Sequence, residues 1–376
     1  MALTRRQFVN AVLAGGGLVA LTRCLPQASD TGDSSRGRSP NSPESGATPT
    51  GSPTPSPANS TDEPAYVALE RQGKFADRVD SAYEMYERCR LCPRACGVNR
   101  LRGEVGACRA PGRQVVVYSH SPHFGEELPL VGRNGSGTVF FSNCNLRCVF
   151  CQNWPIAHEG RGRRESDEAL ADRMLELQRL GCHNINVVTP THVMPNILAA
   201  IRIAMKKGLS LPICYNTGGY DAIEAVRLLD GIVDIYLPDL KFTDGAESAR
   251  YAGTAPDYPE TAKAAIAEMH RQVGDLVTDS AGIARRGVMI RHLVMPNRIA
   301  GTRAFVEWVA AKLSPATYVN IMAQYRVAHR AFEYPAIARA ITTNEFLEAM
   351  EWAEQAGLTN LDERSVAHRE MFRRRN

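Results

Sequence analysis

Beyond residue 136, short apolar segments rich in β-branched and aromatic residues alternate with longer segments in which apolar residues recur every three or four positions. The short segments predict β-strands, and the longer ones predict amphipathic helices. Strands that alternate with helices indicate a parallel sheet covered by helices, which is an α/β fold. The predicted strands cover residues 138–141, 185–189, 211–215, 232–237, 288–294 and 318–323.

The gaps between these strands hold the predicted helices. A helix over 167–180 follows Ser166, which suits the N-cap position, and a helix over 194–207 ends before Gly208, which suits a helix C-terminus. The other predicted elements are helices over 221–229 and 259–273 and a hairpin around 279–282.

The number of units decides the architecture. Six strand-and-helix units are too few for the complete eightfold TIM barrel. We therefore predict a partial (β/α)6 TIM-type barrel over residues 137–327. A Cys-rich N-terminal extension over 65–136 precedes it, and a C-terminal helical extension over 328–376 follows it.

The N-terminus has the order of an export signal over residues 1–24. Arg5 and Arg6 precede a mostly apolar run over 11–21, which is too short to span a bilayer comfortably. Paired arginines followed by Phe8 resemble a twin-arginine signal. We expect export to a periplasmic or membrane-tethered location, with an uncleaved anchor or a cytoplasmic protein as the alternatives.

The segment over residues 25–64 differs in composition from the rest. Ser, Thr, Pro and Gly make up 26 of its 40 residues, so it cannot bury enough apolar surface to offset the entropy of ordering. It is predicted to be a disordered linker. Cys24, just before it, lies where a lipoprotein would be modified, although Arg23 occupies the place of the expected small residue.

Composition and charge narrow the class of protein. The 376 residues are 44% hydrophobic and 22% charged, close to the averages of soluble globular proteins. The net charge is +4, and no block of like charge stands out in the part beyond residue 64. A nucleic acid is therefore not expected as a partner.

The ten cysteines are unevenly distributed. Cys182 and Cys214 stand apart beside apolar segments, and we interpret both as buried small hydrophobic residues. Seven others fall into two tight groups, which is typical of metal ligands. The groups are Cys89, Cys92, Cys96 and Cys108, and then Cys144, Cys148 and Cys151.

The second group follows the first predicted strand at C-x3-C-x2-C spacing. Thiolates are the usual ligands of iron-sulfur clusters, and four normally hold a four-iron cluster, so three leave one iron without a protein ligand. By analogy with zinc, where a free coordination position marks a catalytic site, this spacing favours chemistry at the metal. A zinc knuckle or a disulfide loop is the alternative.

The first group has C-x2-C-x3-C-x11-C spacing, and four ligands can close a site. A zinc ion or an auxiliary iron-sulfur cluster would cross-link this segment and contribute to its folding. Electron relay to the other group and a purely structural role remain open, as do two disulfides in an exported protein.

Polar residues follow the predicted strands. In parallel α/β folds the reactive residues gather where strands end and loops begin, so these side chains are candidate site residues. Each also has a structural alternative as a cap, a turn residue or half of an ion pair. The principal candidates are Thr189, Thr191, Asn216, Asp239, Lys241 and Arg291.

The octapeptide from Cys144 to Cys151, with Phe150 before its last cysteine, resembles the signature of the radical S-adenosylmethionine (SAM) superfamily. Within it, the chain is similar to the pyruvate formate-lyase activating enzyme group, and its four-cysteine motif is similar to an uncharacterised branch of that group. One departure is Thr189-Pro190-Thr191, where many members carry a glycine-rich acidic motif. The closest segments are 144–154, 189–195, 215–221, 237–242 and 291–296.

The resemblance implies cofactors and their ligands. A 4Fe-4S cluster would be held by Cys144, Cys148 and Cys151, and SAM would bind beside it. Phe150 would lie against the adenine, Thr189 and Thr191 would meet the amino group, and Asn216 would meet the ribose. The polar edge of the methionine would contact Asp239, Lys241 and Arg291.

The resemblance also implies an activity. The chain would be an oxidoreductase that takes an electron from a low-potential donor, cleaves SAM to a 5′-deoxyadenosyl radical and abstracts hydrogen from a peptide or protein. Activation of a glycyl radical, by abstraction at a glycine Cα, is one version of this activity. No residue is indicated as catalytic. The rival interpretation is a non-catalytic iron-sulfur electron carrier or a metal-stapled surface protein, which would have no use for an open iron.

Overall fold

The computed structural model of the protein describes residues 63–374. The predicted signal over 1–24, with Cys24, and nearly all of the predicted linker over 25–64 lie outside the described residues. Among residues 63–374, no helix combines the length and the apolar character needed to cross a bilayer.

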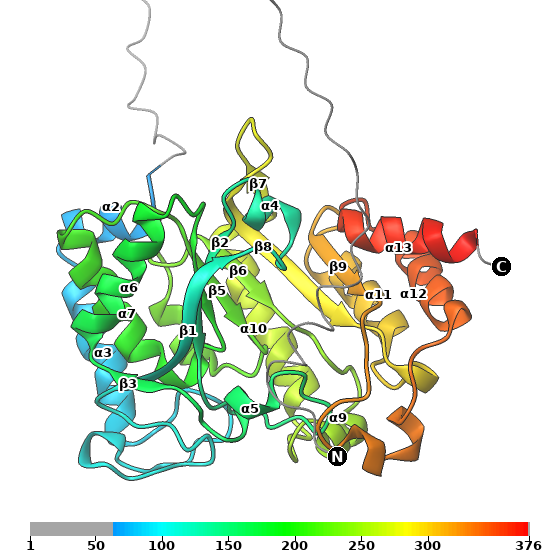
Figure 1. The fold of residues 1–376 in the computed structure, drawn as a ribbon, viewed down its shortest axis with the longest axis horizontal. Helices are drawn as coiled ribbons and strands as arrows, with labels where there is room; N and C mark the ends of the chain where they lie inside the picture. The colour runs from blue at the N-terminus through cyan, green and yellow to red at the C-terminus, as the bar shows by residue number, and fades with distance from the viewer. Residues whose placement is uncertain (1–62, 375–376) are drawn as a thin grey trace, which may run out of the picture. The chain divides into compact units, whose positions relative to one another are not determined.

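The six predicted strands are all present, and each pairs in parallel with the next (Figure 1). Their order in the sheet is therefore their order in the chain, which confirms the partial (β/α)6 barrel. The third and fourth strands begin two or three residues later than predicted. The strands are β2 (Ser136–Phe141), β4 (Ile185–Val188), β5 (Ile213–Thr217), β6 (Ile235–Pro238), β8 (Ala284–Leu293) and β9 (Tyr318–Met322).

Three further strands extend the sheet at its margins. The strand β1 (Val115–His123) pairs antiparallel with β2, and β3 (Arg163–Glu165) pairs antiparallel with β1. The sequence did not predict β1, which shows that the Cys-rich extension contributes a strand to the barrel sheet. The short β7 (Val277–Thr278) pairs antiparallel with β8 and confirms the predicted hairpin.

The predicted helices follow their strands with ends shifted by a few residues. The first of them begins after Ser166, whose side chain accepts a hydrogen bond from the amide of Ala169, as expected of an N-cap. These helices are α6 (Asp167–Arg179), α7 (Met194–Lys206), α8 (Ile223–Leu228) and α10 (Tyr258–Val273), and α11 (Thr302–Lys312) adds to them.

The two extensions add helices outside the barrel. In the N-terminal extension, α2 (Ala65–Arg71) contacts α3 (Phe75–Glu87), which packs on α7 and α8. In the C-terminal extension, α12 (Thr343–Gln355) packs on α11, and α13 (Glu363–Arg373) packs on α12 and β9 (Figure 1). The remaining α-helices of residues 63–374 are α4 (Leu128–Val131), α5 (Trp154–Ala157) and α9 (Gly245–Tyr251).

A small apolar cluster fills the barrel at the amino ends of its strands. Cys214, Ile235 and Tyr318 belong to it and lie at or next to the first residue of their strands, and Leu130 of α4 joins them. The helix α4 therefore closes this end of the barrel. A functional site is expected at the opposite end, at the carboxyl ends of the strands. Both Cys214 and Cys182 are buried, as predicted.

Candidate functional site

A cavity of about 300 Å³ lies at the carboxyl ends of the barrel strands. This volume is at the lower end of the range of small-molecule sites. Residues from the six barrel strands or the loops that follow them line it. The lining includes most of the predicted site residues, namely Cys144, Cys148, Cys151, Phe150, Thr189, Asn216, Asp239, Lys241 and Arg291.

The cysteine loop after β2 is shaped by its backbone. Asn143 and Arg147 have φ angles of 74° and 67°, in the left-handed region, and so fold the loop tightly. The amide of Leu146 donates to the Cys144 sulfur over 3.4 Å, and the amide of Val149 donates to the carbonyl of Tyr251 over 2.9 Å. These bonds hold the three thiols on one wall of the cavity.

The thiols are not arranged around a single ion. In residues 63–374, no group of three or more His, Cys, Asp or Glu side chains has the geometry to hold one metal ion. The cysteines of a four-iron cluster each bind a different iron, so a shared cavity wall is what that cofactor requires. Burial raises the pKa of Cys148 and raises that of Cys151 to about 11, so metal binding must displace their protons.

Phe150 also lines this cavity. Its ring packs edge-on against Phe242, with the centroids 5.9 Å apart, and tilts against Tyr325 at 6.3 Å. These contacts fix the ring orientation. The position fits the predicted contact with an adenine.

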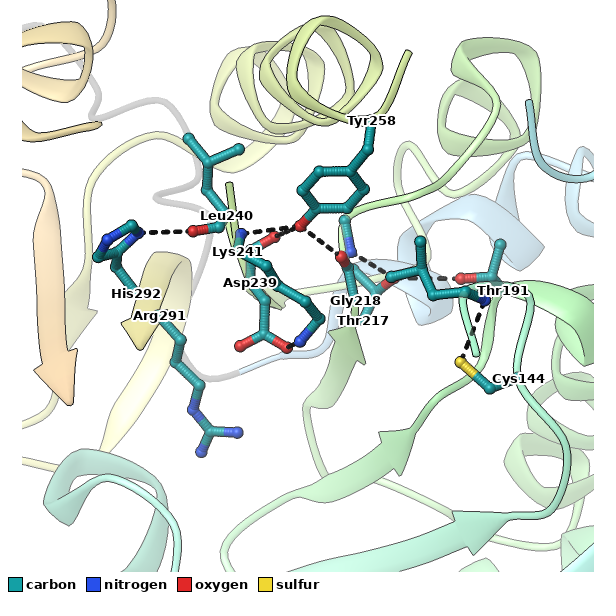
Figure 2. Close-up of polar contacts among 12 residues, drawn as sticks. Cys144, Thr191, Thr217, Gly218, Asp239, Leu240, Lys241, Tyr258, Arg291 and His292 are labelled. Atoms are coloured by element: carbon teal, nitrogen blue, oxygen red, sulfur yellow. Dashed lines mark hydrogen bonds and ion pairs between the residues drawn. The ribbon is translucent and has the colours of Figure 1, made fainter. Parts of the chain in front are cut away.

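Asp239 and Lys241 form an ion pair on the cavity wall, with 2.5 Å between Nζ and the carboxylate (Figure 2). Burial lowers the pKa of Lys241, but Asp239, Tyr258 and Cys148 together outweigh this effect and raise the pKa overall. The lysine therefore stays cationic, and the pair presents one charge of each sign to a ligand.

Tyr258, which the sequence analysis missed, holds two of the strand-end loops together. Its hydroxyl accepts from the amide of Lys241 and lies 2.9 Å from the carbonyls of both Gly218 and Asp239 (Figure 2). Gly219 permits the close approach, because a Cβ there would lie 2.3 Å from the Asp239 carbonyl. Tyr258 precedes the predicted helix over 259–273, and nothing in its local sequence indicates this role.

Asn216 offers an unused hydrogen-bond donor to the cavity. The residue is 7% exposed, and its side-chain Nδ2 is buried without a partner. Its carbonyl accepts from the amide of Thr189, which has a φ of 60°, a strained conformation for a β-branched residue. An unpaired buried donor and a strained neighbour are both typical of a ligand site.

Thr191 does not line the cavity, in contrast to the expectation that it contacts the amino group of SAM. Its hydroxyl lies 3.1 Å from that of Thr217 (Figure 2). The Thr217 hydroxyl in turn donates to the buried carboxylate of Asp221 over 2.6 Å. The reason is that the chain turns into a 3-10 helix directly after Pro190 and carries Thr191 behind the cavity wall.

Arg291 lines the cavity, but its guanidinium already has partners in the barrel interior. Nε donates to Glu127 over 2.6 Å, and Nη2 contacts both Glu126 and Glu127. Burial raises the pKa of Glu127, but Arg291 and the hydrogen bond from Asn320 together outweigh this effect and lower the pKa, so the carboxylate stays charged. Asn320 completes the cluster by donating to Glu127 over 2.7 Å. The sequence analysis missed both glutamates, which precede α4.

His158, also missed, lies beside the cysteine loop. Its ring centroid is 4.4 Å from that of His329, and its Nε2 is buried without a partner. Burial and then His329 lower the pKa of His158 to about 4, so the ring is neutral at physiological pH. A neutral, unpaired nitrogen beside the cavity can accept or donate one hydrogen bond to a ligand.

The four cysteines of the N-terminal group lie together around a second, small pocket. Cys89, Cys92, Cys96 and Cys108 line it with Arg100 and His192. The two cysteine loops also touch, because Arg94 donates hydrogen bonds to the carbonyls of Asn145 and Leu146. The sequence analysis predicted neither the pocket that the four cysteines share with Arg100 and His192 nor the contact between the two cysteine loops.

The chain resembles known proteins over its barrel. A model of the radical SAM superfamily matches residues 138–279. An uncharacterised protein of Methanocaldococcus jannaschii is 31% identical over 290 residues, which cover 75% of this chain and 78% of the relative.

Solved structures show weaker similarity. A radical SAM methyltransferase from Sphaerobacter thermophilus is 13% identical with a TM-score of 0.42, covering 81% of this chain and 94% of its own. A maturase of the FeFe-hydrogenase is 12% identical with a TM-score of 0.41, covering 77% of this chain and 56% of its own.

Proposed function

Because the chain belongs to the radical SAM superfamily, we propose that it cleaves SAM reductively at a 4Fe-4S cluster and abstracts hydrogen from a peptide or protein. The observation that carries the proposal is one cavity lined by three thiols, an unpaired amide donor and an ion pair. This combination suits a cofactor that binds a cluster at one end and carries its own charges.

The residues present fit both cofactors. Cys144, Cys148 and Cys151 would hold a cluster with one iron free of protein ligands. When bound and reduced by a low-potential donor, the cluster supplies the electron that breaks a carbon-sulfur bond of SAM and yields a 5′-deoxyadenosyl radical, which takes hydrogen from substrate.

The side chains of the cavity have separate tasks in holding SAM. Asn216 would donate its unpaired Nδ2 to a ribose hydroxyl, and Phe150 would lie against the adenine. The methionine end of SAM carries an ammonium and a carboxylate, for which Asp239 and Lys241 offer opposite charges. Arg291 is paired with Glu126 and Glu127, so its charge is already compensated. It would therefore add to the polar edge of the methionine site mainly by lining it.

The size of the cavity supports a peptide or protein substrate. About 300 Å³ must accommodate SAM beside the cluster, which leaves little enclosed room for a separate small molecule. An extended chain can instead present one residue to the cavity, whose lining includes Gln152, His158 and Gln324. A glycine Cα is the narrowest version of the proposal, since glycine lets a backbone approach closely.

Deuterium transfer tests the substrate class. Anaerobic enzyme with dithionite and SAM is incubated with a perdeuterated bacterial extract, divided by dialysis into macromolecules and small molecules. We expect deuterated 5′-deoxyadenosine with the macromolecular fraction, and none with the Cys148→Ala variant. Deuterium delivered by the small-molecule fraction alone would contradict the proposal. Extract labelled in glycine alone then tests the glycine Cα.

A further inference from the structure

Arg100 is a buried cation that no carboxylate neutralises. The residue is 1% exposed, its Nη1 donates to the carbonyl of His192 over 2.6 Å, its Nη2 donates to the carbonyl of Pro111, and its guanidinium lies over the Tyr86 ring at 4.1 Å. No Asp or Glu of residues 63–374 forms a salt bridge with it, and its Nε is without a partner. A buried charge is strongly unfavourable unless a partner of opposite sign compensates it.

The groups that surround Arg100 are thiols. Cys89 and Cys108 both lie close enough to the guanidinium to interact with it electrostatically, and both line the same small pocket as Arg100. Cys92 and Cys96 complete the lining. Neutral thiols cannot compensate a guanidinium, whereas thiolates bound to a metal can.

A second unpaired group faces the same pocket. His192 is 2% exposed, and its Nε2 lies 2.8 Å from the carbonyl of Ser142. A carbonyl can only accept, so Nε2 carries the hydrogen. The other ring nitrogen, Nδ1, is buried without a partner. Buried nitrogen atoms are rarely left unpaired in a native protein, which points to a group absent from the polypeptide.

We infer that Cys89, Cys92, Cys96 and Cys108 bind a second metal centre. This centre is an anionic metal-thiolate group, whose negative charge and the positive charge of Arg100 compensate each other, and the unpaired nitrogen of His192 faces it. Four thiolates outweigh the charge of a zinc ion or of an iron-sulfur core, so either centre is negative and serves Arg100 equally. In the described residues the four sulfurs do not have the geometry to hold one ion, so metal binding would draw together side chains that the fold already gathers around one pocket. This inference is independent of SAM chemistry.

The centre would also be connected to the loop of the other cysteine group. Arg94, between Cys92 and Cys96, donates to the carbonyls of Asn145 and Leu146, and the Asn145 side chain lies near the Cys92 thiol. Asn145 adjoins Cys144 in the chain. A metal at the first group therefore stabilises the loop that carries the second.

Metal analysis of full-length protein tests the inference. The Cys144→Ala, Cys148→Ala and Cys151→Ala triple variant, reconstituted anaerobically, should retain either iron with sulfide or zinc in stoichiometric amount. Adding Cys92→Ser and Cys96→Ser together should abolish it, because only two thiols then remain in the pocket. Cys96 is exposed and Cys92 is half-buried, so their replacement should not disturb the fold. Cys182→Ser is the control that should leave the metal content unchanged. A triple variant without stoichiometric metal, or one whose metal content is unaffected by the two added substitutions, would overturn the inference.

The role of Arg100 has its own measurement in the same triple-variant background. If the centre is an iron-sulfur cluster, Arg100→Gln should lower its reduction potential, because a nearby positive charge favours the reduced and more negative form. If the centre is zinc, the variant should release it to a chelator faster. Arg100→Lys should restore much of either property. Circular dichroism would show whether the Arg100→Gln protein is folded. If it is folded and its reduction potential or zinc release rate is unchanged, charge compensation by Arg100 is refuted.

Discussion

Arg94 donates a hydrogen bond to the carbonyl oxygen of Leu146 over 3.2 Å, and thereby joins two cysteine loops that are 52 residues apart in the chain. The same guanidinium donates to Gly253 over 2.6 Å. Hydrogen bonds from a charged donor contribute about 1.5–3 kcal/mol when buried. The loop that carries Cys144, Cys148 and Cys151 therefore depends on a residue of the other loop for its conformation.

Arg94→Gln should loosen the loop between Cys144 and Cys151, because it removes the charge and the forked donors. We expect a loss of about 2 kcal/mol in the free energy of unfolding and weaker retention of iron during gel filtration. Arg90→Gln is the control, since Arg90 is exposed in the same segment. Equal iron retention in the two variants would show that the clamp has no effect.

Tyr258→Phe should misplace the loops after β5 and β6. Without the hydroxyl, the amide of Lys241 and the carbonyls of Gly218 and Asp239 lose a buried partner, at about 1–3 kcal/mol. We expect a raised KM for SAM as well as lower stability. Tyr66→Phe, which loses one bond to Leu211 at the other end of β5, should lower stability without changing KM. If the KM for SAM is unchanged in both variants, Tyr258 does not position the loops of the site.

Lys241→Gln should weaken SAM binding by about tenfold, since it removes a cation whose hydrogen-bonded ion pair is largely shielded from solvent. Asp239→Asn should have a similar effect, and the double variant should lose less than the sum, because the two groups act as a pair. Isothermal titration with SAM measures this. The matched control is Lys263→Gln, whose partner Glu260 is largely exposed. Additive losses in the double variant would argue against a coupled pair.

The contribution of Asp234 to the free energy of unfolding should fall as the pH rises toward neutrality. Its carboxylate accepts from the amides of Ala65 and Ile213, and burial raises its pKa from 3.8 to about 7. A carboxyl whose pKa is higher in the folded state stabilises the fold most below its unfolded pKa, and loses that contribution as the pH rises through about 7.

The measurement is denaturant unfolding of wild type and Asp234→Asn between about pH 4 and pH 7. The stability of wild type relative to the variant should decrease steadily over this range, because asparagine does not titrate. A difference that is constant with pH would place the pKa of Asp234 near its ordinary value.

The sequence predicted what depends on local pattern. The six barrel strands, the Ser166 cap and the cysteine spacing were recognisable because periodicity, capping and ligand spacing involve neighbouring residues. The strand β1 was not predicted, because only its first three residues are fully buried and its alternation of apolar and polar residues is therefore weak.

The rest depends on tertiary packing. Tyr258 meets partners 17 to 40 residues away in the chain, and Glu127 meets Arg291 across 164 residues. Thr191 was expected in the cavity because it follows a strand, but a single 3-10 turn places it behind the wall. Sequence order alone cannot distinguish a residue that faces the cavity from one that supports its wall.

Product analysis of SAM cleavage tests the central claim most directly. Wild-type protein reconstituted anaerobically with iron and sulfide, then given dithionite and SAM, should form 5′-deoxyadenosine. The Cys148→Ala variant should form none, and Cys182→Ala, which removes a buried thiol outside the site, should behave as wild type. Equal product from Cys148→Ala and wild type, or no product from iron-loaded wild type, would contradict radical SAM chemistry in this cavity.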